Sequence, residues 1–335
     1  MFMNPAKLFF LLTLFSSTMI VISSNSWFSA WMALEINLLS FIPLISNSSN
    51  IMASEAALKY FLIQSMASIT LLLFILLIHL IPSNFLLPEY SSNLFLSSSL
   101  LLKLGAAPFH FWFPSIMEGL TWFNCLILMT WQKIAPMILL FNVKITNTFL
   151  LSITILSIIT GSLGGLNQIS LRKLMAYSSI THLGWMIAAI LLTSNLWYIY
   201  LIIYSLITLS MTLVFSFKNL FYVPQILSLS LNPNTKLFLF LNLLSLGGLP
   251  PFLGFLPKWL VIQNMALSNP FIITLMVIFT LMTLYYYLRL AFTAYLLIYP
   301  NNKWHLETPY PWYPFAASTL TIFTLPFLSI VPAHL

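Results

Sequence analysis

Three ionisable residues stand near the middle of long apolar segments of this 335-residue chain: Glu35, Lys103 and Lys133. An ionised side chain at the centre of a bilayer costs about 2.5–3.5 kcal/mol on insertion scales, so such groups must face one another, water or polar backbone. A single Glu–Lys ion pair that fixes the register of two helices would account for only two of the three. The additional lysine therefore favours a proton relay over a purely structural pair.

Lysine suits a relay because its affinity for a proton responds to its surroundings. Desolvation favours the neutral amine, whereas a nearby carboxylate favours the charged ammonium. Small changes in pairing can then decide whether the side chain holds a proton. Arginine cannot be switched in this way, and none occupies a mid-segment position here.

A third lysine, Lys258, follows residues that interrupt a helix. Gly247-Gly248-Leu249-Pro250-Pro251 precedes it, and Gly254 and Pro257 lie closer still. Proline removes a hydrogen-bond donor and clashes with the preceding turn, so this run cannot continue as regular helix. Two interpretations remain open: a relay lysine beside a broken membrane helix, or a lysine near the segment end that reaches the membrane interface.

Two histidines have similarly open roles. His110 follows a second predicted break, at Gly105 and Pro108 just after Lys103, and His182 lies about eight residues into its own apolar segment. Each would hand protons between neighbouring groups, or would be a hydrogen-bonded core histidine.

These residues must be positioned by membrane helices. Hydrophobic residues make up 60% of the chain and charged residues 5%, an inventory that cannot cover a water-soluble surface. About 20 apolar residues cross a bilayer as a helix, and alternating strand patterns are absent, which disfavours a β-barrel. The sequence predicts an all-α polytopic protein, a single transmembrane domain over 1–335 with about 11 spans. The predicted spans are 8–24, 27–45, 57–80, 94–113, 122–141, 148–167, 175–193, 196–217, 237–262, 270–297 and 314–332.

The distribution of basic residues predicts the orientation of these spans. With eleven spans, eight cations fall on the N-terminal face and only Lys144 falls on the other. Loops on the side of the membrane where the protein is synthesised carry the excess of Lys and Arg, so the N-terminus is expected on that side and the C-terminus across the membrane. The eight are Lys7, Lys59, Arg172, Lys173, Lys218, Lys236, Arg289 and Lys303.

Several functions are disfavoured by what the sequence lacks. The net charge of +7 comes from scattered basic residues without clustered aromatics, so nucleic acid is not an expected partner. Cys125 is the single cysteine, which rules out a disulfide or an Fe–S cluster within this chain, and no GxGxxG motif marks a dinucleotide site. We expect no cofactor and no metal in this chain. Gly161 and Gly165 form a GxxxG pair that predicts close packing of two helices.

Five segments together resemble a known family. In their order and spacing they are similar to the antiporter-like membrane subunits of respiratory complex I, the NADH:ubiquinone oxidoreductase, and in particular to its mitochondrially encoded, arthropod-like members. The resemblance covers the entire chain. The segments are WMALEINLLSFIPL around Glu35, LLLKLGAAPFHFWFP around Lys103, LMTWQKIAPM around Lys133, LRKLMAYSSITHLGW with His182, and LSLGGLPPFLGFLPKW around Lys258.

The resemblance implies a fold and roles for four residues. The fold would consist of two related five-helix half-channels, each with a discontinuous helix. Glu35 and Lys103 would form the ion pair that gates the site, Lys133 would bridge toward the centre, and Lys258 would end the relay.

The resemblance also implies an assembly. Partners would be other complex I subunits, especially neighbouring antiporter-like and small membrane-arm subunits, together with lipids such as cardiolipin. NADH, FMN, Fe–S clusters and ubiquinone would be used in other subunits. The location would be the mitochondrial inner membrane, with the N-terminus in the matrix and the C-terminus toward the intermembrane space.

The predicted function is therefore proton translocation as a core membrane-arm subunit of this enzyme, coupled to redox chemistry done elsewhere. A free-standing cation/proton antiporter is the main alternative, but a chain without Asp and with one mid-span Glu offers few ligands for sodium. A purely structural assembly subunit is the third hypothesis, for which the buried lysines would be costly without benefit.

Overall fold

The computed structural model describes most of the chain as helix. Across the described residues, strand-like pairing is limited to one isolated antiparallel bridge, between Ser170 and Tyr222. The predicted span 314–332 and the residues Lys144 and Lys303 lie outside the described part. The described residues are 5–47, 50–80, 89–143, 146–192, 194–228 and 233–296.

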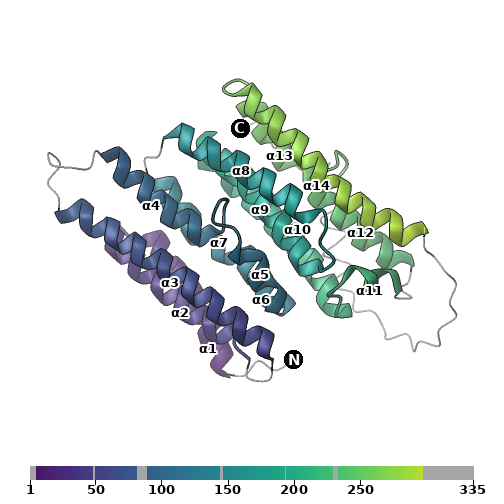
Figure 1. Ribbon diagram of the computed structural model, residues 1–335, viewed down its shortest axis with the longest axis horizontal. Coiled ribbons are helices and arrows are strands. Elements are labelled where there is room, and N and C mark those ends of the chain that lie inside the picture. The colour runs from purple at the N-terminus through teal and green to yellow at the C-terminus, as the bar shows by residue number, and fades with distance from the viewer. Residues whose placement is uncertain are drawn as a thin grey trace. The chain divides into compact units, whose positions relative to one another are not determined.

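The chain divides into two compact units, and the first is Met1–Ile153. In this unit α1, α2 and α3 pack in sequence, α3 also contacts α4 and α5, and α4 contacts α7 (Figure 1). Its helices are α1 (Pro5–Ser23), α2 (Trp27–Ile45), α3 (Ile51–Leu80), α4 (Glu89–Leu104), α5 (Trp112–Gly119), α6 (Trp122–Met129) and α7 (Trp131–Asn142).

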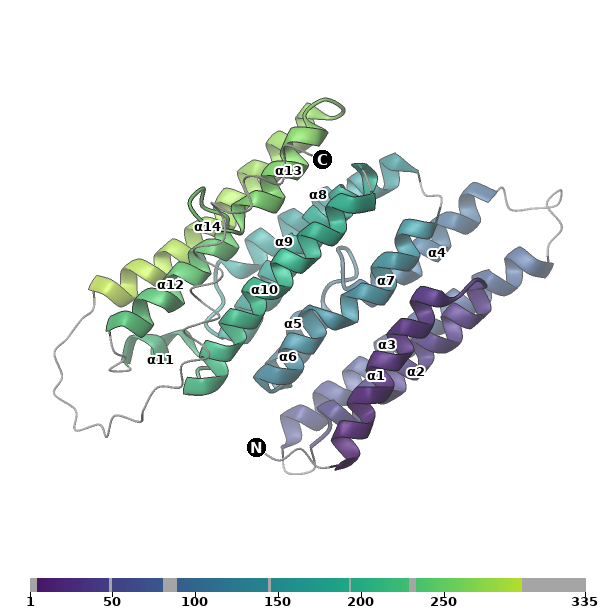
Figure 2. The same cartoon turned by 180° about the vertical axis from the view of Figure 1, so that it is seen from behind.

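The second unit is Thr154–Leu335, and α8 crosses the boundary between the two units. Within it α10 packs against α9, α12 and α13, and α14 contacts α11, α12 and α13 (Figure 2). Its helices are α8 (Asn147–Gly165), α9 (Leu171–Leu192), α10 (Ser194–Lys218), α11 (Val223–Ser228), α12 (Pro233–Gly247), α13 (Phe255–Met265) and α14 (Pro270–Leu296).

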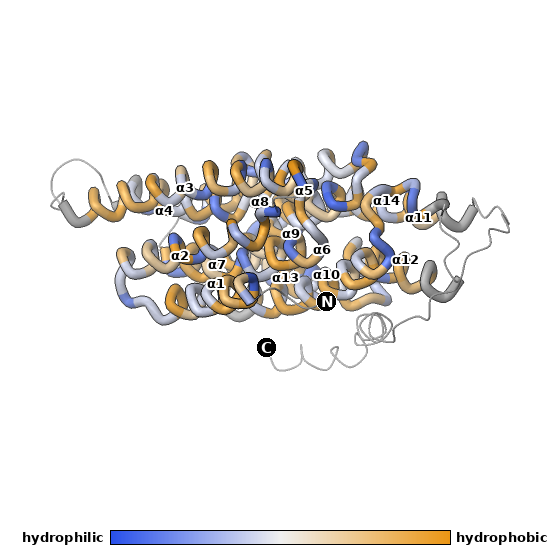
Figure 3. Tube along the Cα trace, turned by 90° about the horizontal axis from the view of Figure 1, so that it is seen from below, coloured by the Kyte–Doolittle hydropathy of each residue, from blue (hydrophilic) through white to orange (hydrophobic). Residues whose placement is uncertain are grey.

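The helices have the length and composition of membrane spans. Among the described residues, eight are long and apolar enough to cross a bilayer, with α6 and α7 counted as one span. Apolar residues extend along the helices rather than along one stripe (Figure 3), and α3 exposes Leu58, Leu62 and Met66 on its outer face. An outer surface of this kind suits lipid. The prediction of a polytopic helical membrane protein is confirmed, and the count of eleven remains a prediction.

The two helices that were predicted to be broken are interrupted in the same way. Gly105 (φ 73°) follows α4 and Gly248 (φ 84°) follows α12, both in the left-handed region that glycine adopts without strain. After α4, Gly105 N donates to Leu102 O (3.2 Å) and Ala106 N to Leu101 O (3.2 Å). This pair of hydrogen bonds is the Schellman arrangement that closes a helix at its C-terminus.

The break after α12 repeats that arrangement. Gly248 N donates to Ser245 O (3.0 Å) and Leu249 N to Leu244 O (3.4 Å). In both breaks a Pro-Phe pair begins three residues after the glycine. The 143 residues that separate Gly105 from Gly248 also separate the first residues of α5 and α13, and of α3 and α10. The chain therefore repeats one helical plan, which confirms the predicted pair of related halves with a discontinuous helix in each.

The predicted GxxxG packing is present in the second unit. A methyl group at Gly161 would lie 2.5 Å from Thr181 Cγ2 and 2.8 Å from the Tyr177 carbonyl oxygen of α9. A methyl group at Gly165 would lie 2.9 Å from the Tyr286 ring of α14. These two glycines therefore let neighbouring helices approach α8 closely.

Candidate functional site

Lys103 is the penultimate residue of α4 and is buried at the break that follows. The carbonyl groups at this broken end are capped by side chains from other helices. Gln64 Nε2 of α3 donates to Lys103 O (3.3 Å), and Trp112 Nε1 of α5 donates to Leu102 O (3.2 Å). Such capping satisfies acceptors that a continuous helix would have satisfied itself, and it fixes the end of α4 from which Lys103 projects.

Lys133 is the third residue of α7, just after the interruption at Thr130 that separates α6 from α7. Its side chain is 2% exposed, and its Nζ lies 5.6 Å from the centroid of the Phe113 ring. An aromatic face at this distance attracts a cation. Pro136 lies inside α7 and has no N–H to donate to the Gln132 carbonyl, so the helix also lacks one backbone hydrogen bond next to Lys133.

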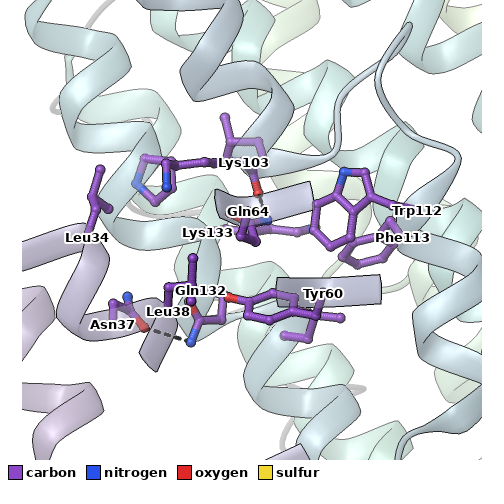
Figure 4. Close-up of a pocket in the computed structure, with 13 residues that line it drawn as sticks. Leu34, Asn37, Leu38, Tyr60, Gln64, Lys103, Trp112, Phe113, Gln132 and Lys133 are labelled. Atoms are coloured by element: carbon purple, nitrogen blue, oxygen red, sulfur yellow. Dashed lines mark hydrogen bonds between the residues drawn. The ribbon is translucent and has the colours of Figure 1, made fainter. Parts of the chain in front are cut away.

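Both lysines line one small cavity in the first unit (Figure 4). Its volume is about 20 Å³, which is enough for one water molecule. The polar neutral residues of the lining are Asn37, Tyr60, Gln64 and Gln132, and no carboxylate is among the lining residues. The other lining residues are Leu34, Leu38, Leu104, Trp112, Phe113, Leu128 and Pro136.

Glu35 does not line this cavity. Leu34, Asn37 and Leu38 form the face of α2 that does, at helical positions i, i+3 and i+4. Glu35 Oε2 is buried without a hydrogen-bond partner, and Lys103 lies within electrostatic range of the Glu35 carboxylate.

The gating ion pair implied for Glu35 and Lys103 is not a direct contact in this structure. An ion pair within 4.0 Å does occur on the exposed face of α3, between Lys59 and Glu55 at 2.6 Å. The gating role of Glu35 therefore stays a prediction.

Lys258 is buried at the break of the second unit. Its Nζ donates to Gly247 O (2.9 Å) and Leu246 O (3.4 Å), the last carbonyl groups of α12. The side chain is 6% exposed, and a methyl group at Gly248 would lie only 2.9 Å from Nζ. A cation at the C-terminal end of a helix interacts favourably with the helix dipole. Of the two interpretations left open by the sequence, this placement supports the lysine beside the broken helix.

The two histidines occupy different surroundings. His182 of α9 is buried, with its Nδ1 2.8 Å from the Tyr200 hydroxyl and its ring 4.9 Å from the Tyr204 ring. His110 donates from Nδ1 to Pro108 O (3.3 Å) within its own loop and lies 4.3 Å from the Phe111 ring. Neither histidine lines the cavity of the two lysines.

Three amide residues of this site were not predicted from the sequence. Asn37, Gln64 and Gln132 all line the lysine cavity, and Gln132 Nε2 donates to Asn37 Oδ1 (3.0 Å). A usable signal was present, because an amide inside an apolar span also needs a polar partner. The described residues contain no group of three or more His, Cys, Asp or Glu side chains placed to hold a metal ion.

Comparisons with known proteins agree with one another. Residues 24–283 match the family described as NADH:quinone oxidoreductase/Mrp antiporter, TM. Over 302 residues the chain is 57% identical to NADH-ubiquinone oxidoreductase chain 2 of Anopheles gambiae, with 89% of this chain and 88% of that protein covered. The protein of the same name from Locusta migratoria is 47% identical, with 91% and 90% covered.

Solved structures show the same fold. A chain of respiratory complex I from Thermus thermophilus matches with a TM-score of 0.85 and 26% identity, covering 99% of this chain and 79% of that one. A chain of the Mrp complex from Dietzia sp. matches with a TM-score of 0.76 and 15% identity, covering 90% and 61%.

Proposed function

This chain belongs to the NADH:quinone oxidoreductase/Mrp antiporter family of membrane subunits, and from that premise we propose that it translocates protons as a core membrane subunit of NADH:ubiquinone oxidoreductase. Its relatives in mosquitoes and locust carry the name of chain 2 of that enzyme. It is a multi-pass membrane protein of the antiporter-like type, and as such it contributes to the enzyme without a redox centre of its own.

The observation that carries the proposal is the cavity shared by Lys103 and Lys133. Two ammonium groups beside one cavity repel each other, and no carboxylate lines the cavity to neutralise them. The arrangement therefore favours a state in which one lysine is charged and the other is neutral. A single proton can be exchanged between such a pair at little cost.

The cavity also supplies a route for that exchange. One water would accept a proton from the Lys103 ammonium while it gives another of its protons to the Lys133 amine. One N–H bond and one O–H bond break as one O–H bond and one N–H bond form, so the water is unchanged and one proton has moved. Neutral amide and phenol groups solvate the charge at either end without trapping the proton.

The second unit offers further groups for the relay. Lys258 would exchange a proton at the break after α12, where main-chain carbonyls already solvate its ammonium. His182, hydrogen-bonded to Tyr200, would serve as an intermediate donor and acceptor.

Two residues of the first unit complete the proposed set. Glu35 would modulate Lys103 through its charge. His110, bonded within its own loop, has the least support of the proposed residues.

The remaining parts of the proposal concern the assembly. NADH, FMN, Fe–S clusters and ubiquinone would act in other subunits, and this chain would pack against other antiporter-like and small membrane-arm subunits. It would lie in the mitochondrial inner membrane, with the N-terminus in the matrix and the C-terminus toward the intermembrane space. Lipids such as cardiolipin would cover its outer surface. A free-standing sodium antiporter is less well supported, because the cavity lining offers no carboxylate ligand.

Replacement of Lys103 by Met tests the proposal. The variant keeps an unbranched side chain but cannot carry a proton, so the enzyme should assemble while the number of protons moved per NADH oxidised falls. Lys59→Met is a matched control, since Lys59 is an exposed lysine of the same unit on the outer face of α3. The measurement is proton translocation in sealed membranes together with the quantity of assembled enzyme. Unchanged proton-to-electron ratios in well-assembled Lys103→Met enzyme would refute the relay.

A further inference from the structure

The hydrogen bond between Asn37 and Gln132 joins the two helices on which the relay depends. Asn37 lies on α2 two residues after Glu35, and Gln132 is the neighbour of Lys133 at the start of α7. Gln132 Nε2 donates to Asn37 Oδ1 at 3.0 Å, and Figure 4 shows this contact at the edge of the lysine cavity. Asn37 is 3% exposed, whereas Gln132 is partly exposed, so the hydrogen bond between them is part-buried.

The chemistry of the pair suits a role in orienting rather than storing protons. Carboxamides do not titrate in the physiological range, so neither side chain can hold a transferred proton. The contact uses one donor of Gln132 and one acceptor site of Asn37, which leaves the Gln132 carbonyl oxygen as an acceptor and the Asn37 amide as a donor. One acceptor and one donor side by side can hold a water in a single orientation.

The position of the pair is set by two irregularities of the backbone. The interruption at Thr130 turns the first residues of α7 toward the cavity, and Pro136 leaves the Gln132 carbonyl without the hydrogen bond that a regular helix would give it. The start of α7, which carries Gln132 and Lys133, therefore has fewer backbone hydrogen bonds than a regular helix. The contact with Asn37 supplies a fixed point for this segment on α2.

We infer that Asn37 and Gln132 are positioning residues for proton exchange between Lys103 and Lys133, holding Lys133 and the cavity water in the geometry that transfer requires. This inference rests on the proposed relay and adds to it a pair of residues that never carries the proton. Proton transfer depends steeply on the separation and alignment of donor and acceptor. A loosened Lys133 would therefore exchange protons more slowly even though both lysines remain.

The test uses Asn37→Leu and Gln132→Met in the assembled enzyme, each of which removes the amide while keeping a similar side-chain size. We expect the rate of proton translocation to fall about tenfold, because each variant removes one hydrogen bond that positions Lys133 and the free energy of one hydrogen bond corresponds to roughly a factor of ten. The exchanged double variant Asn37→Gln/Gln132→Asn restores two amides of the same combined length and should recover most of the rate. A structural role alone would not produce this recovery in pumping at unchanged assembly.

Asn124→Leu provides the matched control. Asn124 is another buried amide of the first unit, and its Nδ2 donates to Leu44 O of α2 (2.8 Å), but it does not line the lysine cavity. Its loss should lower assembly or stability without changing the rate of proton translocation by the enzyme that does assemble. The inference is overturned if Asn37→Leu and Gln132→Met behave like Asn124→Leu, or if the exchanged pair recovers nothing.

Failure of this inference can be told apart from failure of the relay. If Lys103→Met abolishes pumping while the amide variants pump normally, the relay stands and the positioning role falls. If Lys103→Met pumps normally, the relay falls whatever the amide variants do.

Discussion

Gly248→Ala should displace the Lys258 ammonium from the carbonyl groups that hold it. The added methyl would lie 2.9 Å from Lys258 Nζ and 3.0 Å from its Cδ, so the end of the side chain must move away. It would also place an L-residue at a φ of 84°. The adjacent Gly247 is a matched control, because a methyl there meets Leu284 Cγ at an ordinary 3.6 Å and has no left-handed backbone to adopt.

The expected magnitude has two parts. A non-glycine residue in the left-handed region costs about 1–2 kcal/mol. Loss of the charged hydrogen bonds from Lys258 to Gly247 O and Leu246 O costs about 1.5–3 kcal/mol more. The free energy of unfolding should therefore fall by about 2.5–5 kcal/mol in Gly248→Ala and by much less in Gly247→Ala.

A double-mutant cycle separates the two parts. In a Lys258→Met background the hydrogen bonds are already gone, so Gly248→Ala should cost only the backbone part, about 1–2 kcal/mol. The assay is the heat stability of the assembled enzyme in solubilised membranes, followed by native electrophoresis for the four variants in parallel. Equal losses for Gly248→Ala and Gly247→Ala, or full additivity with Lys258→Met, would refute the contact on which this reasoning depends.

Three further outcomes are expected. Glu35→Gln should keep the enzyme assembled but reduce proton translocation, since it removes the charge that acts on Lys103; normal proton-to-electron ratios would contradict this. Residues 217–236 should be labelled by impermeant reagents from the matrix and the C-terminus from the intermembrane space, whereas labelling of both from one side would show that the span count is wrong. Gly119→Ala should lower the stability of the protein by about 1–3 kcal/mol and so reduce the amount of assembled enzyme, because its methyl would collide with the Met52 carbonyl oxygen of α3; wild-type assembly would show that α3 and α5 can separate freely.

The features predicted best from the sequence are those with a strong local cause. The breaks after Lys103 and before Lys258 follow directly from Gly and Pro, which cannot continue a regular helix. Burial of the lysines at those breaks and along α7 follows from the apolar length around them. The family resemblance, confirmed by the comparisons, was carried by the same segments.

Other features depend on contacts that no local pattern encodes. The interruption at Thr130 has only Pro136 as a signal, six residues away, and the face that α2 turns to the cavity follows from its packing rather than from its composition. The Asn37–Gln132 contact joins residues 95 positions apart. The 143-residue repeat was available in the sequence, since both breaks share a glycine followed by Pro-Phe at the same spacing.

The repeat of the backbone does not extend to the placement of the charged residues. At the separation of 143 residues, Lys103 corresponds to Leu246 and Lys133 to Met276, so neither lysine has a basic counterpart in the second unit. Lys258 occupies a position of its own. The two units share a backbone plan while their ionisable groups differ. The ionisable residues of one unit therefore cannot be predicted from those of the other.

The hydrogen bonds that hold Lys258 have a genetic consequence. Its acceptors are main-chain carbonyls, which every amino acid possesses, so no single codon change in Leu246 can delete the acceptor that this residue supplies. Inherited substitutions along the end of α12 should for that reason be harmless to the lysine's solvation so long as they preserve the turn. Harmful variants should concentrate at the few positions whose side chains determine the conformation of the turn. A substitution there would displace the carbonyl groups from the Lys258 ammonium.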